Sequence, residues 1–489
     1  MKKYYSIKGR IILWVLFCFL LISSSILLAQ EKEISITTSS EEALKYFLEG
    51  RDKQENIAFN SAAKLLDKAI EIDPDFALAY LYRADSGGGF NIQRKHLEKA
   101  VSLVDKVSEG EKHWILARKA YADSDTPKMK EHMEHLMKLY PSDKRVQLLM
   151  GNYYYALAQD FPNALQYYNQ VIELDKDYAP VYNMLGYCHL AMENYEGAEE
   201  VFKKYIELIP DAPNPYDSYA EFLMDRGRYE ESIEQYKKAY EKDPLYTGAL
   251  AGVGNNHVFK GEFDKAREYY QKWFDSTGNV NEKLSAHFLK AVSYVHEGKI
   301  EEALKALDEY QTLAQNEKLV PSDIFSLRVK GYVLTETGDE AEGLKQFEKA
   351  AEILKGSELS QSVKETQTLN LAMDRVYALA ANNKLEKAGK EAAACKEIVG
   401  KRQNPYEEMA LNDTMGMLEL KKGNAEEAIA YLSKGDKQSP RNWFLIGKAY
   451  TKKGDKEKAK EFFTKIVESN VNSMPLALAK TRAKEMLKK

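Results

Sequence analysis

The chain has 489 residues, of which 44% are hydrophobic and 30% are charged, with a formal net charge of −5. This hydrophobic content supports a sizeable core and excludes wholesale disorder, and the acidic, mixed charge excludes a general nucleic-acid binder. Only 13 Pro and 27 Gly are present, which is few for an all-β protein.

The first thirty residues are predicted to direct export. Basic side chains at positions 2, 3, 8 and 10 precede the apolar run 11–22, and three serines follow this run. This order is typical of a secretory signal peptide, here residues 1–29, cleaved after Ser25 or after Ala29. The alternative is a retained membrane anchor, because 11–28 is marginally long enough to span a bilayer. Cys18 lacks the preceding small residues of a lipoprotein signal, so no lipid anchor is expected.

Both interpretations place the remainder of the chain outside the cytoplasm. A basic N-terminal flank stays on the cytoplasmic side, so we expect a periplasmic protein or one attached to the outer face of the inner membrane. Membrane contact is expected only through 11–28, if this segment is retained. Residues 30–42 are expected to be a short linker. Cys188 and Cys395 are far apart in the sequence and are predicted to be buried free thiols.

A unit of 34 residues repeats along the rest of the chain. Four consecutive blocks begin at 145, 179, 213 and 247, and they align without insertion or deletion. Position 8 of these blocks reads Asn152, Gly186, Ala220 and Gly254. Position 24 reads Tyr168, Phe202, Tyr236 and Tyr270. Further units begin near 43, 77, 111, 284, 324, 369, 409 and 440, so the sequence predicts twelve units.

The spacing within a unit predicts a pair of helices. Positions 4, 7, 8 and 11 share one face of a first helix, and positions 20, 24 and 27 share one face of a second. Small residues at positions 8 and 20 allow the two helices to approach closely, and the aromatic residue at position 24 fills the space beside them. Proline at position 32, as at Pro210 and Pro244, ends the second helix. Each pair leaves an apolar face bare, so only stacking completes the core.

This pattern resembles the tetratricopeptide repeat. Block 179–212 carries the residues of that family at Tyr182, Leu185, Gly186, Ala198, Phe202 and Pro210. His189 and Tyr205 depart from the pattern at positions 11 and 27. The resemblance implies an all-α, right-handed superhelical solenoid of about twelve helix hairpins. Residues 474–489 are expected to form a last helix that caps the stack.

Two regions deviate from the regular repeat. Glycines at 87–89 fall where the first helix of the unit at 77 should continue, so this helix is predicted to be short or distorted. After residue 280 the units lengthen, and the extra residues fall in polar segments at 315–323, 355–367 and 400–408. We therefore predict a regular array over 43–280 and a looser array with the capping helix over 281–489.

No pattern in the sequence indicates a reaction. A phosphate-binding glycine loop, a nucleophile elbow and an HExxH motif are absent from the sequence, so we predict no catalytic residues, no metal and no cofactor. His132 and His135 could share a metal on one helix, but an ordinary helix surface is favoured because no third ligand stands at a defined spacing. His189 and His257 fall at position 11 and are expected to be packing residues.

The inner wall of the superhelix is the candidate binding surface. The resemblance implies that positions 2, 5, 9 and 12 of successive first helices line this wall and hold peptides. The predicted wall contains Leu149, Tyr153, Asn183, Tyr187, Asp217, Glu221, Asn255, Phe259 and Phe288. Its aromatic and amide side chains can hold an extended segment. The alternative is that Tyr153 and Tyr187 only pack against neighbouring first helices.

The leading hypothesis is a non-enzymatic exported scaffold that binds protein or peptide segments along this concave face. Clamping of a C-terminal carboxylate, known in this family, is not expected because Asp217 would repel it. One alternative is an envelope protein that captures carbohydrate or a small ligand, although such a protein would need long inserted loops and a lipidated cysteine. Another is the sensor part of a signalling system, since 37–50 resembles the start of repeat regions in membrane-tethered sensors.

Overall fold

The computed structural model describes residues 33–87 and 89–488 of the chain. The export segment expected at residues 1–29 lies outside the described residues. Within these ranges all regular elements are helical, and twelve consecutive helix pairs are followed by one further helix. The predicted all-α solenoid of about twelve hairpins is therefore confirmed. No helix in these ranges is long and apolar enough to cross a membrane.

The helices of the first seven pairs are α2 (Glu41–Glu55) and α3 (Phe59–Ile72), α4 (Ala77–Ala84) and α5 (Phe90–Ser102), α6 (Glu109–Ala122) and α7 (Thr126–Leu139), α8 (Lys144–Asn152) and α9 (Phe161–Leu174), α10 (Ala179–Ala191) and α11 (Tyr195–Leu208), α12 (Asn214–Asp225) and α13 (Tyr229–Lys242), and α14 (Gly248–Phe259) and α15 (Phe263–Ser276). The remaining helices are α16 (Val280–Glu297) and α17 (Ile300–Asn316), α18 (Val320–Thr337) and α19 (Glu340–Gly356), α20 (Gln361–Ala381) and α21 (Leu385–Arg402), α22 (Pro405–Lys422) and α23 (Ala425–Leu432), α24 (Pro440–Lys453) and α25 (Lys456–Glu468), and α26 (Met474–Leu487).

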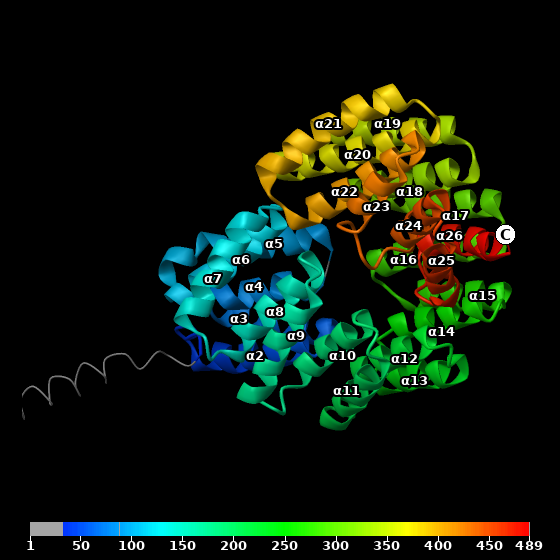
Figure 1. Ribbon diagram of the computed structural model, residues 1–489. Helices are drawn as coiled ribbons and strands as arrows, with labels where there is room; N and C mark the ends of the chain where they lie inside the picture. Colours follow the sequence, from blue (N-terminus) through cyan, green and yellow to red (C-terminus); the bar gives the residue numbers. More distant parts are fainter. Residues whose placement is uncertain (1–32, 88, 489) are drawn as a thin grey trace, which may run out of the picture.

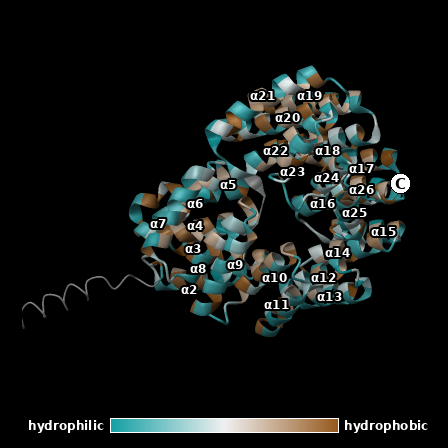
Figure 2. Cartoon of the chain, viewed as in Figure 1, coloured by the Kyte–Doolittle hydropathy of each residue, from teal (hydrophilic) through white to brown (hydrophobic). Residues whose placement is uncertain are grey.

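Each helix packs mainly against its partner in the pair and against the next pair along the chain. In Figure 1 the pairs run from α2 at the lower left through α10–α13 at the bottom to α14–α17 at the right, and then to α19–α21 at the top. Figure 2 shows hydrophobic and hydrophilic residues mixed within the helices, as amphipathic helices in a stacked array require.

The small residue at position 8 lies directly against the aromatic ring at position 24. A Cβ atom added to Gly186 would lie 2.5 Å from Cε1 of Phe202, and one added to Gly254 would lie 2.5 Å from Cε1 of Tyr270. Carbon atoms in contact stay about 3.5–4.0 Å apart, so neither site has room for a methyl group. This contact sets the close approach of the two helices in these two pairs.

Replacing Gly186 with alanine should therefore destabilise the protein, although alanine is the better helix former. Helix propensity favours the substitution by about 1 kcal/mol. Overpacking against Phe202 costs about 1–3 kcal/mol, and we expect a net loss of stability in urea unfolding followed by circular dichroism. Gly389 is the control, because it lies within α21 and has nothing within 4 Å of its added Cβ atom. Gly389→Ala should stabilise by about 0.5–1 kcal/mol. Equal effects of the two substitutions would contradict the packing described.

The fourth pair differs from the predicted alignment by one residue. Gly151, and not Asn152, is the residue whose added Cβ atom would meet the ring of Tyr168. After α8 the chain forms a π-helical turn, η2 (Tyr153–Leu157), which accommodates one extra residue. The expectation that the blocks align without insertion is therefore wrong at the block beginning at 145.

The two irregular regions have different outcomes. Helix α4 has 8 residues and is followed by Gly87 and Gly89, whose φ angles are +83° and +82°, so the predicted short helix is confirmed. The longer units after residue 280 extend their helices, because α16 to α22 have 17 to 21 residues. The polar segments lie at the junctions of these longer helices, and within them Ser360 and Asn404 cap the helices that begin there.

Residues 33–40, within the expected linker, are bound along the first pairs of helices. The backbone N–H of Ile34 donates to Oδ2 of Asp143 at 2.9 Å, and that of Thr37 donates to Oε1 of Glu111 at 2.8 Å. The hydroxyl of Thr38 donates to Oδ2 of Asp73 at 2.6 Å. These carboxylates satisfy donors of an extended segment that has no helical hydrogen bonds of its own.

Helix α26 contacts helices far away in the sequence as well as the last pair. It packs against α16, α24 and α25, and in Figure 1 it lies at the right between these helices. Its Met474 and Ala477 join the core around Val292 of α16, while Leu476 joins the core around Phe444 and the C-terminal pair. The last helix therefore ties the end of the chain to its middle.

Candidate functional site

Two residues of the predicted wall lie in the core between helix pairs. Tyr153 is 7% exposed and packs with Leu149 in the cluster formed by α6, α7 and α8. Because of the one-residue shift, Asn152 takes the wall position that was predicted for Tyr153. The hydroxyl of Tyr168 donates to Oδ1 of Asn152 at 3.0 Å. The expectation that Tyr153 lines the wall is therefore wrong. Tyr153 instead packs against the neighbouring helix pair, as the alternative interpretation proposed.

Asn152 was missed because the π-helical turn leaves no mark in the repeat spacing. A signal that could have identified Asn152 is the hydrogen bond between an asparagine of the wall and the tyrosine at position 24 of the second helix. At the equivalent position of a later pair, the hydroxyl of Tyr270 donates to Oδ1 of Asn255 at 2.8 Å. The shared pairing aligns Asn152 with Asn255, and not with Gly254.

Three further residues of the predicted wall are covered by the chain itself. The Nδ2 group of Asn472 donates to Oδ1 of Asn255 at 2.8 Å. Phe259 lies 4.9 Å from the ammonium group of Lys480 of α26, measured to its ring centroid, and joins the C-terminal core. Phe288 packs against Phe325 at a centroid distance of 5.6 Å. These three side chains therefore contact other residues of the same chain.

Polar contacts join the C-terminal pairs to the inner side of earlier pairs. The hydroxyl of Tyr229 donates to Oδ1 of Asn470 at 3.1 Å, and Nδ2 of Asn470 donates to the carbonyl oxygen of Asp225 at 3.2 Å. Nε2 of Gln159 donates to Oδ1 of Asp436 at 2.9 Å. The segment that contains Asp436 and Asn470 therefore covers part of the concave face.

Four residues of the predicted wall remain together on α10 and α12. They are Asn183 and Tyr187 on α10, and Asp217 and Glu221 on α12. The hydroxyl of Tyr187 donates to Oε2 of Glu221, and its ring packs edge-on against Phe202 at 5.3 Å. Glu221 is exposed and Asp217 is half-buried, whereas Asn183 is buried. We call these four residues the acidic wall.

The two carboxyl groups of the acidic wall have no basic partner. In the part of the chain that the structure describes, no Lys or Arg side chain forms an ion pair with either group. Burial raises the pKa of Asp217 well above its usual value, and the neighbouring charge of Glu221 raises it further. Although the residue as a whole is exposed, the surrounding helices desolvate the Glu221 carboxyl group and raise its pKa, and the hydrogen bond from Tyr187 opposes this shift. The surroundings therefore disfavour the charged forms.

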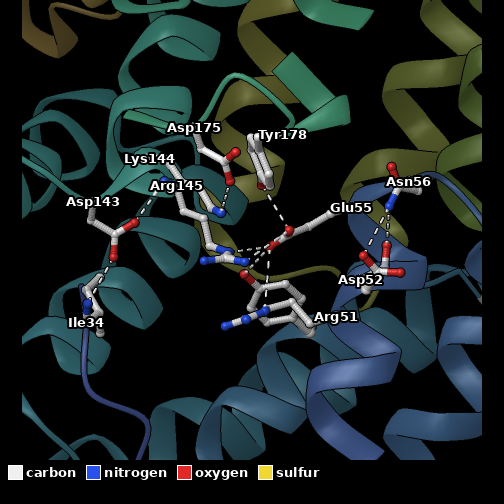
Figure 3. A network of polar contacts seen from close by, with 11 residues as sticks. Ile34, Arg51, Asp52, Glu55, Asn56, Asp143, Lys144, Arg145, Asp175 and Tyr178 are labelled. Carbon is white, nitrogen blue, oxygen red and sulfur yellow. Dashed lines mark hydrogen bonds and ion pairs between the residues drawn. The ribbon is translucent and has the colours of Figure 1, made fainter. Parts of the chain in front are cut away.

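A second polar network joins the first, fourth and fifth pairs of helices. Glu55 of α2 accepts from Nε of Arg145 at 2.7 Å and from the hydroxyl of Tyr178 at 2.9 Å, as Figure 3 shows. Burial lowers the pKa of the Arg145 guanidinium, but Glu55, Tyr82 and Tyr178 together raise it overall. The network connects residues that are 90 and 123 positions apart, and it leaves these polar groups paired.

The histidines and cysteines of the described residues form no metal-binding group. His113 of α6 lies beside His132, with the two Nδ1 atoms 3.0 Å apart, and stacks on His135 at 4.8 Å. Over residues 33–87 and 89–488, no group of three or more His, Cys, Asp or Glu side chains could hold a metal ion. Cys188 and Cys395 are buried free thiols as predicted, and burial raises the pKa of each to about 11.

The comparisons with known proteins agree with the repeat architecture. Residues 155–220, 220–280, 254–318 and 440–470 match family models of the tetratricopeptide repeat. No curated protein matches the sequence. Together with the twelve helix pairs, the matches identify the chain as a member of the tetratricopeptide-repeat proteins.

Similar solved structures include repeat proteins of different lengths. The Cut9–Hcn1 hetero-tetramer of APC/C matches at 13% identity over 92% of this chain and 81% of that chain, with a TM-score of 0.41. A tetratricopeptide repeat protein from Parabacteroides merdae matches at 18% identity over 56% and 97%, with a TM-score of 0.35. YrrB, described as having an unusual peptide-binding site, matches at 18% identity over 38% and 94%, with a TM-score of 0.26.

Proposed function

We propose that the chain is a scaffold that binds protein or peptide segments at the acidic wall on α10 and α12. Tetratricopeptide-repeat proteins are typically non-enzymatic scaffolds. The observation that carries the proposal is that Glu221 is exposed and Asp217 half-buried, both without a basic partner. At Asn255 and Phe259 the wall is already engaged by the C-terminal segment. A partner can therefore add contacts at the acidic wall without displacing that segment.

Site-specific photocrosslinking should locate the partner on the inner side. A benzoylphenylalanine residue would be placed at Glu221 or at Gln438, which is exposed and hydrogen-bonded to Tyr155 on the inner side. We expect protein adducts from both positions in living cells, because a bound segment would lie within reach of both. Mass spectrometry of the adducts would identify the partner.

Lys203 of α11 and Lys237 of α13 are the matched controls, since both are exposed on second helices. Few adducts are expected there, because the outer face is not part of the proposed surface. Adducts from Lys203 and Lys237, with none from Glu221 and Gln438, would move the binding surface to the outer face and contradict the proposal.

We also propose that the scaffold works outside the cytoplasm, on the basis of residues 1–29. A C-terminal alkaline phosphatase fusion should be active, because this reporter folds only after export. A fusion to a reporter that works only in the cytoplasm should be inactive. The opposite pair of results would contradict export, and the mass of the purified protein would distinguish cleavage after Ser25 or Ala29 from a retained anchor.

A further inference from the structure

The acidic wall presents two like charges on one face of α12. Asp217 and Glu221 are four residues apart, so their side chains are neighbours on the helix surface and repel each other when both are ionised. Glu221 is exposed and Asp217 is half-buried, so part of each residue lies at the surface. Within the described chain, this charge has no cation to offset it. Such a pair is stabilised when a cation binds from outside.

Asn183 supplies an independent observation that points to a ligand. Asn183 lies one helical turn before Tyr187 on α10. Because the Tyr187 hydroxyl donates to Glu221, this face of α10 is directed toward the carboxylates of α12. Asn183 is only 6% exposed, and its Oδ1 atom is buried without a hydrogen-bond partner. A buried acceptor left without a donor is unfavourable, because it has lost its hydrogen bonds to water. A donor from a bound ligand would remove this cost.

Tyrosine rings border the same place. The carboxylates of Asp217 and Glu221 act on Tyr187, Tyr236 and Tyr246, where burial and these negative charges together raise the pKa of each hydroxyl. The phenols therefore stay neutral and keep their electron-rich rings. Aromatic faces attract ammonium and guanidinium groups. Tyr236 is buried, but Tyr187 and Tyr246 are half-buried, so acceptor oxygens and these two rings occur together, and both recognise a cation that carries several N–H donors.

We propose that Asp217, Glu221 and Asn183 bind the guanidinium or ammonium group of an arginine or lysine side chain in a partner segment. The two carboxylates supply the charge, and Oδ1 of Asn183 accepts one further N–H. An uncharged or acidic side chain at the same place would leave the carboxylates without a counter-ion. This proposal rests on the proposed scaffold function and specifies what the scaffold recognises.

Blocked heptapeptides provide a direct test with the full chain. The parent peptide is acetyl-Ala-Tyr-Ala-Arg-Ala-Tyr-Ala-amide, and three others carry Lys, Gln or Glu at the centre. Calorimetric titration should give dissociation constants at least about tenfold lower for the Arg and Lys peptides than for the Gln peptide, with the Glu peptide weakest; tenfold corresponds to about 1.4 kcal/mol. Asn183→Ala should weaken the Arg peptide and leave the Gln peptide unchanged.

The double variant Asp217→Asn, Glu221→Gln should lose the preference for Arg and Lys while its melting temperature stays at or above that of the parent. The matched control is Glu196→Gln, Glu200→Gln, because these carboxylates have the same spacing on α11 and are exposed. It should keep the full preference. Comparing the peptide preferences of the two double variants therefore distinguishes the loss of the binding site from a general loss of negative surface charge.

Equal affinity for the Arg and Gln peptides, no binding of any peptide, or an unchanged preference in the Asp217→Asn, Glu221→Gln variant would overturn the cation site. The photocrosslink at Gln438 does not involve either carboxylate. Adducts at Gln438 together with any of these peptide results would reject the cation site and leave the scaffold function standing. Absence of inner-side adducts would instead reject the scaffold function itself.

Discussion

Replacing Arg328 with methionine is expected to lower the free energy of unfolding by about 3–5 kcal/mol, because it leaves a buried carboxylate unpaired. Nε of Arg328 on α18 lies 2.5 Å from Oδ2 of Asp374 on α20, and Asp374 is 2% exposed. Burial lowers the pKa of the Arg328 guanidinium, but the charge and the hydrogen bond of Asp374, together with nearby tyrosines, raise this pKa overall. Tyr332 also donates its hydroxyl to Asp374, and one hydroxyl does not replace the lost positive charge.

Urea unfolding of three variants would check this expectation. The double variant Arg328→Met, Asp374→Leu removes both charges and should recover most of the lost stability. Lys390→Ala is the surface control, because Lys390 and Glu386 form a pair whose side chains are 76% and 84% exposed. It should change stability by at most about 0.5 kcal/mol. A small effect of Arg328→Met alone would show that Asp374 finds another partner or stays solvated.

Replacing Leu476 with alanine should destabilise the protein by about 2–5 kcal/mol and loosen the C-terminal helix. Leu476 is fully buried in the cluster that joins α26 to Phe444 of α24 and Phe463 of α25. The substitution removes apolar contacts from a site where backbone on three helices limits collapse of the cavity. Thermal unfolding would measure the loss.

Limited trypsin digestion would report whether α26 detaches. Lys480 lies on α26 and is held by the carbonyl oxygen of Ser469 at 2.6 Å, so cleavage at Lys480 should accelerate in Leu476→Ala. Leu487 lies near the end of the same helix and is 38% exposed, so Leu487→Ala should change stability and cleavage little. Equal digestion rates of the parent and Leu476→Ala would contradict the role given to this contact.

The closure by α26 affects which part of the concave face a partner can reach. Asn255 and Phe259 are engaged by Asn472 and Lys480, while Glu221 of the acidic wall is exposed and Asp217 is half-buried. A variant with a loosened α26 would expose Asn255 and Phe259 as additional surface. The folded C-terminal segment therefore covers Asn255 and Phe259 of the predicted wall, and the proposed binding surface is the acidic wall.

The sequence by itself determined the helix pairs, because the contacts within a pair are local. Gly186 meets Phe202 and Gly254 meets Tyr270 at the spacing that the repeat pattern predicts. The short α4 and the buried Cys188 also follow from neighbouring residues. The one-residue shift at Gly151 escaped prediction, because a π-helical turn changes the register without changing the length of the repeat pattern elsewhere.

Only the tertiary structure decided how the C-terminal end of the array meets its middle and which wall residues stay exposed. Asn470 and Asn472 bond to residues more than 200 positions earlier, such as Asp225 and Asn255. Whether such residues meet depends on small rotations between successive pairs, which accumulate over the array. The accumulated rotation is not encoded in the sequence of any single unit. Each helix pair, by contrast, is encoded within its own unit by side chains that lie close together in the sequence.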